Sequence, residues 1–146
     1  KIEIEGVCAG AAIYSVKALE AVKLDNENYF DSNFFAYFED VDLSLRLKSA
    51  GFKAKLLRNS IVYHMHSAPG GKTTGFKEYY LTRNLFMYTK RNQSAEDYKK
   101  HKKEYYIRFL KTVVKNINNF NAVKSAVKGL NDGLKESKKI EYWKVQ

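Results

Sequence analysis

The segment DVDLSLRLKSAG constrains the fold more than any other part of the chain. Leu43, Leu47 and Ala50 recur at the spacing of one helix face. Gly51 follows them, and glycine is the residue at which many helices end. The acids at the start of the segment also favour a helix N-terminus, because their negative charge interacts favourably with the positive end of the helix dipole. The segment therefore predicts a helix over 40–50, entered from the aromatic run FFAYF.

Strand-like patterns flank this helix on both sides. Ile2 and Ile4 alternate with charged residues, and the small apolar run VCAGAAIY continues the pattern to residue 14. Beyond Gly51, the runs KAKLL and SIVYHMH have the composition of two short strands. Between the first strand and the helix, Ser15 precedes a short helical run that ends near Val22. Short strands alternating with helices predict an α/β fold for this part of the chain.

From residue 76 onward the pattern is helical. Helices are expected over about 76–91, 95–117 and 121–130. The second helix carries many lysines and an apolar stripe formed by Tyr106, Leu110, Val113, Val114 and Ile117. A basic amphipathic helix of this kind can lie on an anionic membrane surface, or its stripe can pack against the rest of the protein.

Positive charge is concentrated in the last third of the chain. The net charge is +10, and residues 94–146 hold 13 Lys/Arg against 6 Asp/Glu, whereas residues 1–93 hold 13 against 10. Such a region can face an anionic membrane or a phosphorylated substrate, or it can simply be a solvated helical face. No recognised nucleic-acid-binding motif accompanies the charge, so nucleic acid is not a predicted partner.

The chain has one cysteine, Cys8, which precludes an internal disulfide. This fits a reducing compartment, and we expect the protein in the cytoplasm. Because Cys8 lies within the apolar run VCAGAAI, it is expected to be a small core residue rather than a nucleophile.

Two adjacent acids, Glu39 and Asp40, stand where the aromatic run enters the predicted helix. Unpaired N–H groups and the helix dipole favour an ionised carboxylate at that place, and a positioned carboxylate is what a general base requires. The residues alone favour a structural role, in which Asp40 is an N-cap and Glu39 a first-turn acid.

The tripeptide Asp40-Val41-Asp42 matches the D-x-D pattern of metal sites in sugar-nucleotide enzymes. Residues two apart on a helix point to different sides, so this pair is not expected to share a metal ion. Asp42 is instead four residues from Arg46, which is a favourable spacing for an ion pair.

Two histidines, His64 and His66, fall on one face of the predicted strand SIVYHMH. Either can ligate a divalent metal or contact a diphosphate. A packing or hydrogen-bonding role is the more common one for a histidine on a strand.

Taken in order, the segments GAAIYS, FFAYFEDVDLSLRLKSAGFK, SIVYHMHS and YYLTRN resemble the second half of family-2 glycosyltransferases, and most closely the rhamnosyltransferase-like members. The similarity spans about residues 6–90 and continues weakly as AVKGLNDGL at 126–134. It implies an α/β fold, in which 1–93 form the C-terminal, acceptor-side part of a GT-A catalytic domain and 94–146 a basic helical region.

The resemblance also assigns roles to single residues. Asp40 takes the position of the base that deprotonates the acceptor hydroxyl, and Glu39 that of a residue that orients the base or contacts the acceptor. His64 takes the position of a histidine that completes a divalent-metal site (Mn or Mg) on the donor diphosphate, with His66 in reserve. The remaining matched positions are substrate-binding ones: Gly10 and Ala11 near the donor sugar, and Tyr80, Arg83 and Asn84 near a phosphate.

The reaction implied is the inverting transfer of a sugar from a nucleotide-sugar donor to a hydroxyl of a cell-envelope glycan or a lipid-linked acceptor. Members of this family place a nucleotide-binding half before these segments. We therefore expect the chain, which begins at Lys1 in a strand-like pattern, to be part of a longer protein. By itself it is expected to be inactive, to bind no metal and to self-associate through an uncovered sheet edge.

A different class of function is also compatible with the sequence. In this alternative the chain is a non-catalytic basic module that binds a membrane surface or a protein partner. The segment from Glu39 to His66 distinguishes the two functions. A glycosyltransferase uses its acids and histidines, whereas a non-catalytic module does not require them. Either function is compatible with a location at the inner face of the membrane.

Overall fold

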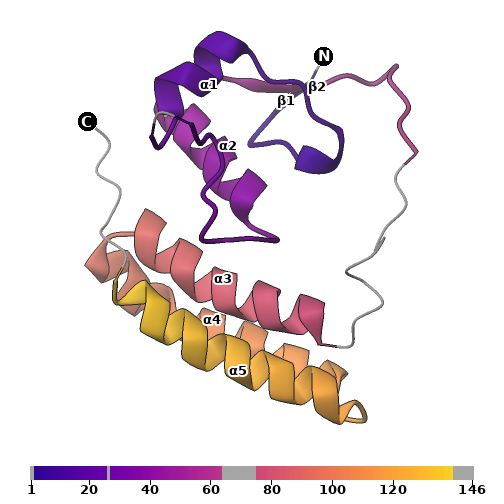
Figure 1. Cartoon of the computed structure of the whole chain (residues 1–146), viewed down its shortest axis with the longest axis vertical. Coiled ribbons are helices and arrows are strands. Elements are labelled where there is room, and N and C mark those ends of the chain that lie inside the picture. The colour runs from indigo at the N-terminus through magenta and orange to yellow at the C-terminus, as the bar shows by residue number, and fades with distance from the viewer. Residues whose placement is uncertain (1, 26, 64–74, 140–146) are drawn as a thin grey trace. The chain divides into compact units, whose positions relative to one another are not determined.

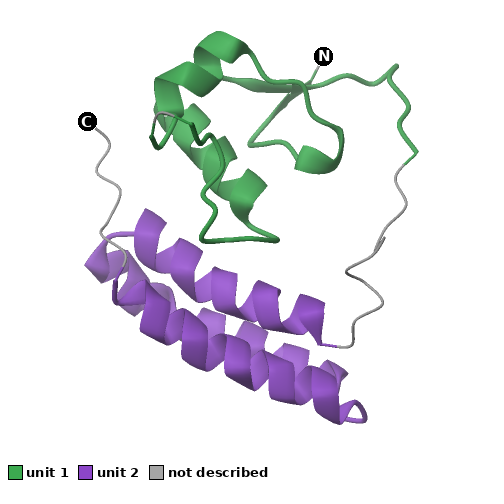
Figure 2. Ribbon diagram, in the orientation of Figure 1, with its two compact units in different colours: residues 1–65, 145 green, residues 66–144, 146 purple. Residues whose placement is uncertain are grey.

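The structure is a computed structural model that describes residues 2–25, 27–63 and 75–139. The chain forms two compact units that divide between residues 65 and 66, shown in green and purple in Figure 2. The division predicted between residues 93 and 94 concerns functional roles rather than compactness, and it stays a prediction.

Unit 1 combines short helices with one small sheet (Figure 1). The two strands are antiparallel, with Ile2 opposite Leu56 and Ile4 opposite Ala54. Phe34 and Leu43 are fully buried, and Ala18 and Val22 are nearly so. The elements in chain order are β1 (Ile2–Ile4), the 3-10 helix η1 (Ala9–Ala11), α1 (Val16–Val22), α2 (Glu39–Ser49) and β2 (Ala54–Leu56).

The predicted α/β fold of a GT-A domain is wrong. The described residues contain five α-helices and one two-stranded antiparallel sheet, so the chain is mostly helical. The run VCAGAAIY departs from a strand because its small side chains offer little surface for cross-strand packing, and part of it turns into η1. Ile61, Val62 and Tyr63 are exposed and have no strand structure, although their composition is typical of strands.

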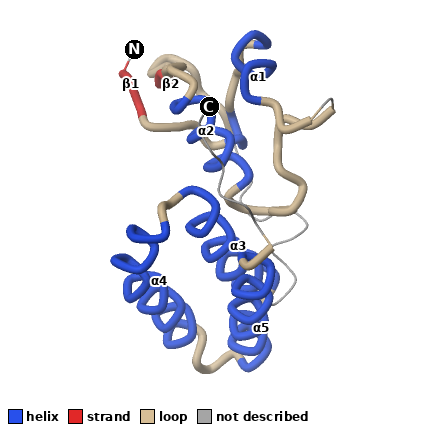
Figure 3. Tube along the Cα trace, turned by 90° about the vertical axis from the view of Figure 1, so that its left-hand side faces the viewer, coloured by secondary structure: helices blue, strands red, loops and turns tan. Residues whose placement is uncertain are grey.

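Unit 2 consists of three helices, α3 (Phe76–Asn92), α4 (Ala95–Lys115) and α5 (Phe120–Ser137) (Figure 3). Two of them begin at side-chain caps. The hydroxyl of Ser94 accepts a hydrogen bond from the backbone N–H of Asp97 at 3.0 Å, and Asn119 accepts one from Ala122 at 3.2 Å. These bonds satisfy N–H groups that have no partner within the helix.

Helices α3 and α5 pack most closely, because α5 presents its smallest residues to α3. Ala122 and Ala126 are buried, and so are Gly129 and Gly133 further along the same face. A Cβ atom added to Gly129 would lie 2.4 Å from the carbonyl oxygen of Tyr79. The glycines therefore set the separation of the two helices, since no larger residue fits between the backbones.

The predicted apolar stripe of α4 is packed against the protein in its first half and exposed to solvent in its second half. In its first half, Tyr105 is buried and donates a hydrogen bond to Gln93 at 2.6 Å, and the ring of Tyr106 lies 5.4 Å from that of Phe86. In its second half, Leu110 and Val114 are exposed. Within the part of the chain that the structure describes, no helix has the length and apolar character needed to cross a membrane.

Candidate functional site

The first turns of α2 hold the segment from Val7 to Ala9, which leads into η1, against one helix face. The hydroxyl of Ser44 accepts a hydrogen bond from the backbone N–H of Val7 at 3.1 Å. One turn earlier on the same face, Oδ2 of Asp40 accepts one from the N–H of Ala9, also at 3.1 Å. Gly6 permits this approach, because a Cβ atom there would lie 2.7 Å from the Cβ of Ser44.

This arrangement places Asp40 beside two other predicted site residues, Gly10 and Ala11. Both belong to η1, whose first residue is bonded to Asp40, and both are exposed. The structure thus brings together the predicted base and the residues predicted to lie near the donor sugar.

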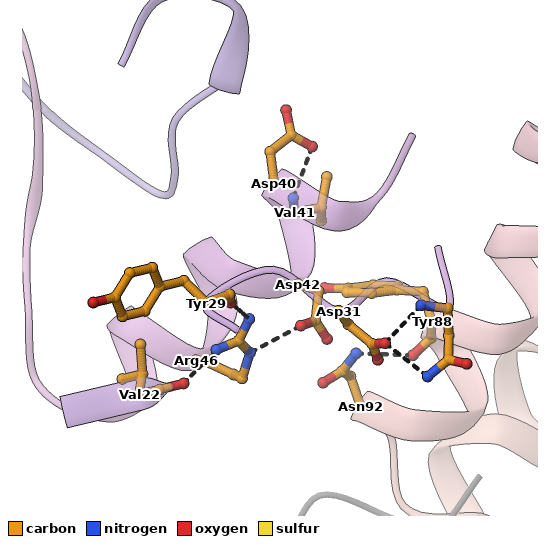
Figure 4. Close-up of polar contacts among 10 residues, drawn as sticks. Val22, Tyr29, Asp31, Asp40, Val41, Asp42, Arg46, Tyr88 and Asn92 are labelled. Carbon is orange, nitrogen blue, oxygen red and sulfur yellow. Dashed lines mark hydrogen bonds and ion pairs between the residues drawn. The ribbon is translucent and has the colours of Figure 1, made fainter. Parts of the chain in front are cut away.

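Asp40 is not the N-cap of α2. The N-cap position belongs to Phe38, which makes no side-chain capping bond. Oδ1 of Asp40 accepts a hydrogen bond from the N–H of Val41 at 2.8 Å, while Oδ2 reaches the separate segment at Ala9. The carboxylate is half-buried and points away from Asp42 (Figure 4). Two backbone N–H groups therefore orient an acid that solvent and a substrate hydroxyl can still reach.

Glu39 and Tyr14 lie close enough to Asp40 for its charge to act on both of them. Oε2 of Glu39 and the hydroxyl of Tyr14 are buried, and among the described residues neither has a hydrogen-bond partner. Burial raises the pKa of Glu39 and the charge of Asp40 raises it further. Burial, followed by the charges of Asp40 and other nearby groups, raises the pKa of Tyr14. Glu39 and Tyr14 therefore keep their protons to higher pH than usual.

The aromatic run before the acids has an unusual backbone. Phe35, Tyr37 and Phe38 have φ angles of 60°, 65° and 73°, a region that side-chain-bearing residues adopt rarely. Each such residue costs on the order of 1–3 kcal/mol, and strained backbone of this kind is concentrated at functional sites. The strained run leads directly into the acid pair.

Asp42, the second aspartate of the D-x-D pattern, forms an ion pair within α2. Oδ2 of Asp42 pairs with Nε of Arg46 at 2.9 Å, and both side chains are fully buried (Figure 4). This confirms the ion pair expected from their spacing. Among the described residues, no group of three or more His, Cys, Asp or Glu side chains could hold a metal ion. The ligands that the resemblance assigns to a divalent metal, His64 and His66, lie outside the described residues, so the metal stays a prediction.

The remaining predicted residues lie apart from this cluster in the chain. His64 and His66 lie outside the described residues, so their predicted roles stay predictions. Tyr80, Arg83 and Asn84 belong to α3 of unit 2. The guanidinium of Arg83 lies 5.6 Å from the centre of the Tyr80 ring, and Asn84 is fully buried. Their predicted phosphate contacts likewise stay predictions.

Sequence reasoning missed Ser44 and Tyr14 and misplaced Cys8. Ser44 could have been found, because it lies one helical turn after Asp40 and so shares its face. Tyr14 belongs to the segment GAAIYS, but no role was predicted for it. Its buried hydroxyl lies where the charges of Asp40 and Glu39 act on it. Cys8 is exposed rather than part of the core, because the run that contains it turns at η1 and is not a buried strand.

Comparison of the chain with protein-family models, with curated protein sequences and with solved structures finds no match in any of the three.

Proposed function

We propose that the chain forms part of an inverting glycosyltransferase in which Asp40 is the general base. The observation that carries the proposal is the pair of backbone N–H groups, of Ala9 and Val41, that hold both oxygens of Asp40 beside the exposed small residues of η1. The sequence segments that resemble family-2 glycosyltransferases support the same role. The proposal concerns the chemistry of this cluster and does not depend on a GT-A fold.

In the proposed reaction, Asp40 removes the proton from an acceptor hydroxyl. The hydroxyl oxygen attacks the anomeric carbon of a nucleotide sugar as the bond from that carbon to the nucleoside diphosphate breaks. The configuration inverts because a single displacement occurs, and the diphosphate carries away the electron pair. A base acts over hydrogen-bond distance, roughly 2.6–3.2 Å, so the fixed orientation of the carboxylate contributes directly to the rate.

The neighbours of Asp40 have supporting roles. Glu39, whose pKa is raised by burial, remains protonated to higher pH than an exposed glutamate. Burial also raises the pKa of the nearby Tyr14 hydroxyl, which therefore keeps its proton and remains a hydrogen-bond donor. We propose the acceptor to be a glycan or lipid-linked sugar and the location to be the cytoplasm. The proposal assigns no step to a metal ion.

The test uses a protein that carries this chain together with the nucleotide-binding half that the resemblance implies. Acceptor-dependent release of nucleoside diphosphate is measured across a panel of nucleotide sugars, for the wild type and for Asp40→Asn. The proposal expects release from at least one donor and a loss of about 10²-fold or more in the variant. Glu27→Gln, which neutralises an exposed carboxylate, is the matched control and should retain full activity. Full activity of Asp40→Asn would exclude the base role.

A further inference from the structure

Four apolar side chains form an exposed strip along the end of α4 and the start of α5. Exposed fractions rise along the strip, from 56% for Leu110 and 66% for Val114 to 69% for Ile117 and 76% for Phe120. Leu110 and Val114 are one turn apart on α4, while Ile117 and Phe120 lie where the chain passes into α5, at one end of the unit (Figures 1 and 3). We call these four residues the hairpin strip.

The hairpin strip continues a face of α4 whose earlier part packs against α3. The ring of Tyr106 lies 5.4 Å from that of the buried Phe86. Leu110 and Val114 follow Tyr106 on the same side of α4, because steps of four and eight residues return close to the same helix face. They are nevertheless exposed, so the second half of this face is apolar and faces solvent. Exposed apolar groups gathered in this way are typical of interaction surfaces.

The stretch of sequence that contains the strip is rich in basic residues and has no acids. Between Glu104 and Asp132 the chain has no Asp or Glu. Among the described residues, none of the basic side chains in this stretch forms an ion pair. All of them are exposed: Arg108, Lys111, Lys115, Lys124 and Lys128.

The charge identifies the class of partner. A second copy of the chain docking through the same strip would bring two sets of unpaired lysines together, and like charges oppose such a contact. Nucleic acid would neutralise the lysines but would leave Leu110, Val114 and Ile117 in water. An anionic lipid surface accommodates both features, because the acyl boundary accepts apolar side chains and the headgroups attract lysines.

We propose that the α4–α5 hairpin binds an anionic membrane surface. The hairpin strip enters the boundary between headgroups and acyl chains, and Lys111 and Lys115 lie against the lipid phosphates. The hairpin lies on the membrane rather than crossing it, which agrees with the absence of a helix suited to span a bilayer among the described residues. The inference stands independently of sugar transfer, since it uses none of the residues around Asp40.

The first test is sedimentation of the full chain with phosphatidylcholine vesicles, prepared with and without phosphatidylglycerol. The chain should sediment with the anionic vesicles and remain in solution with the neutral ones. Binding should weaken at high salt, because salt screens the attraction between lysines and headgroups. Equal binding to both kinds of vesicle, or binding to neither, would overturn the proposal.

The second test separates the apolar and the charged contributions. Val114→Ser combined with Ile117→Ser should weaken binding by about tenfold per residue, as expected for two side chains that remain in water. Ile61→Ser combined with Val62→Ser changes two apolar residues of unit 1 that are 80% and 60% exposed, and it should leave binding unchanged. Equal losses in the two double variants would contradict a specific role for the hairpin strip.

Charge reversal uses a control on the same helix. Lys111→Glu combined with Lys115→Glu should weaken binding to anionic vesicles by roughly fivefold or more for each lysine. Lys99→Glu combined with Lys100→Glu makes the same change in net charge at the far end of α4 and should have a much smaller effect. All the substituted side chains are exposed, so helix content and unfolding midpoint should match the wild type. If the wild type self-associates through the strip and ignores vesicles, a second copy is the partner and the proposal is wrong.

Discussion

The Nε atom of Arg46 lies 2.9 Å from Oδ2 of Asp42, and both side chains are fully buried. The same guanidinium donates to the carbonyl oxygen of Val22, where α1 ends, and to that of Tyr29 at 2.6 Å. One buried cation thus joins α2 to the end of α1 and to the loop that follows it. Its planar fork of donors can serve these three acceptors at once.

Replacement of Arg46 by Met should strongly destabilise unit 1. The change leaves the buried Asp42 without its cation and the carbonyl groups of Val22 and Tyr29 without their donor, which costs about 3–5 kcal/mol of unfolding free energy. Chemical denaturation of the wild type and the variant measures the difference. Lys53→Met is the control, because Lys53 pairs with Glu3 on the surface and such pairs contribute about 1 kcal/mol or less. Equal effects of the two substitutions would contradict the assigned role of Arg46.

Gly133→Ala should loosen the contact between α3 and α5. A Cβ atom at Gly133 would lie 2.6 Å from the carbonyl oxygen of Arg83, and a backbone atom cannot move aside as a side-chain end can. We expect a loss of about 1–3 kcal/mol in unfolding free energy, despite the better helix propensity of alanine. Asn131→Ala, at an exposed position of the same helix, should be neutral or slightly stabilising. A stabilised Gly133→Ala would show that the helices do not touch there.

Glu39 should make stability depend on pH in a direction opposite to that of most acids. Its pKa in the folded state is raised above the ordinary 4.5, so the folded protein holds this proton more tightly than the unfolded chain. The stabilising contribution is therefore complete below the unfolded pKa and is lost as the pH rises through the folded one. Glu39→Gln should remove this loss.

The measurement is the unfolding free energy of the wild type and of Glu39→Gln over the acidic and neutral range. The unfolding free energy of the variant should increase relative to that of the wild type as the pH rises. Glu20 provides a contrast, because hydrogen bonds from Lys23 and Tyr29 lower its pKa. The unfolding free energy of Glu20→Gln should therefore decrease relative to that of the wild type as the pH rises. Parallel curves for the wild type and Glu39→Gln would contradict the buried, unpartnered position of the Glu39 oxygen.

The sequence predicted the helices well because their apolar spacing is regular. The helix expected over 40–50 is α2, Glu39–Ser49, and those expected from residue 76 onward are all present. The last was predicted to end near residue 130, whereas α5 continues to Ser137. Glycine disfavours helices, yet α5 contains both Gly129 and Gly133. In the structure they are retained because α3 lies too close for a side chain.

The strands were predicted poorly, and the candidate site only in part. Alternating residues such as those of KAKLL predict a strand whether or not partners exist to pair with it, and only Ala54–Leu56 pairs here. Glu39 and Asp40 could be identified because adjacent acids at a helix start form a local pattern. The contact between Asp40 and Ala9 joins residues 31 positions apart, and it depends on the path of the chain between them.

The measurement that most directly tests the central claim compares sugar transfer and stability in one variant, Asp40→Asn. Asparagine is similar in size and can still accept a backbone hydrogen bond, but it cannot take up a proton as aspartate does. The account predicts that transfer by the protein carrying this chain falls by about 10²-fold or more, while the unfolding free energy changes by only about 1 kcal/mol. Unchanged transfer together with a loss of stability would show that Asp40 only supports the structure, and it would contradict the account.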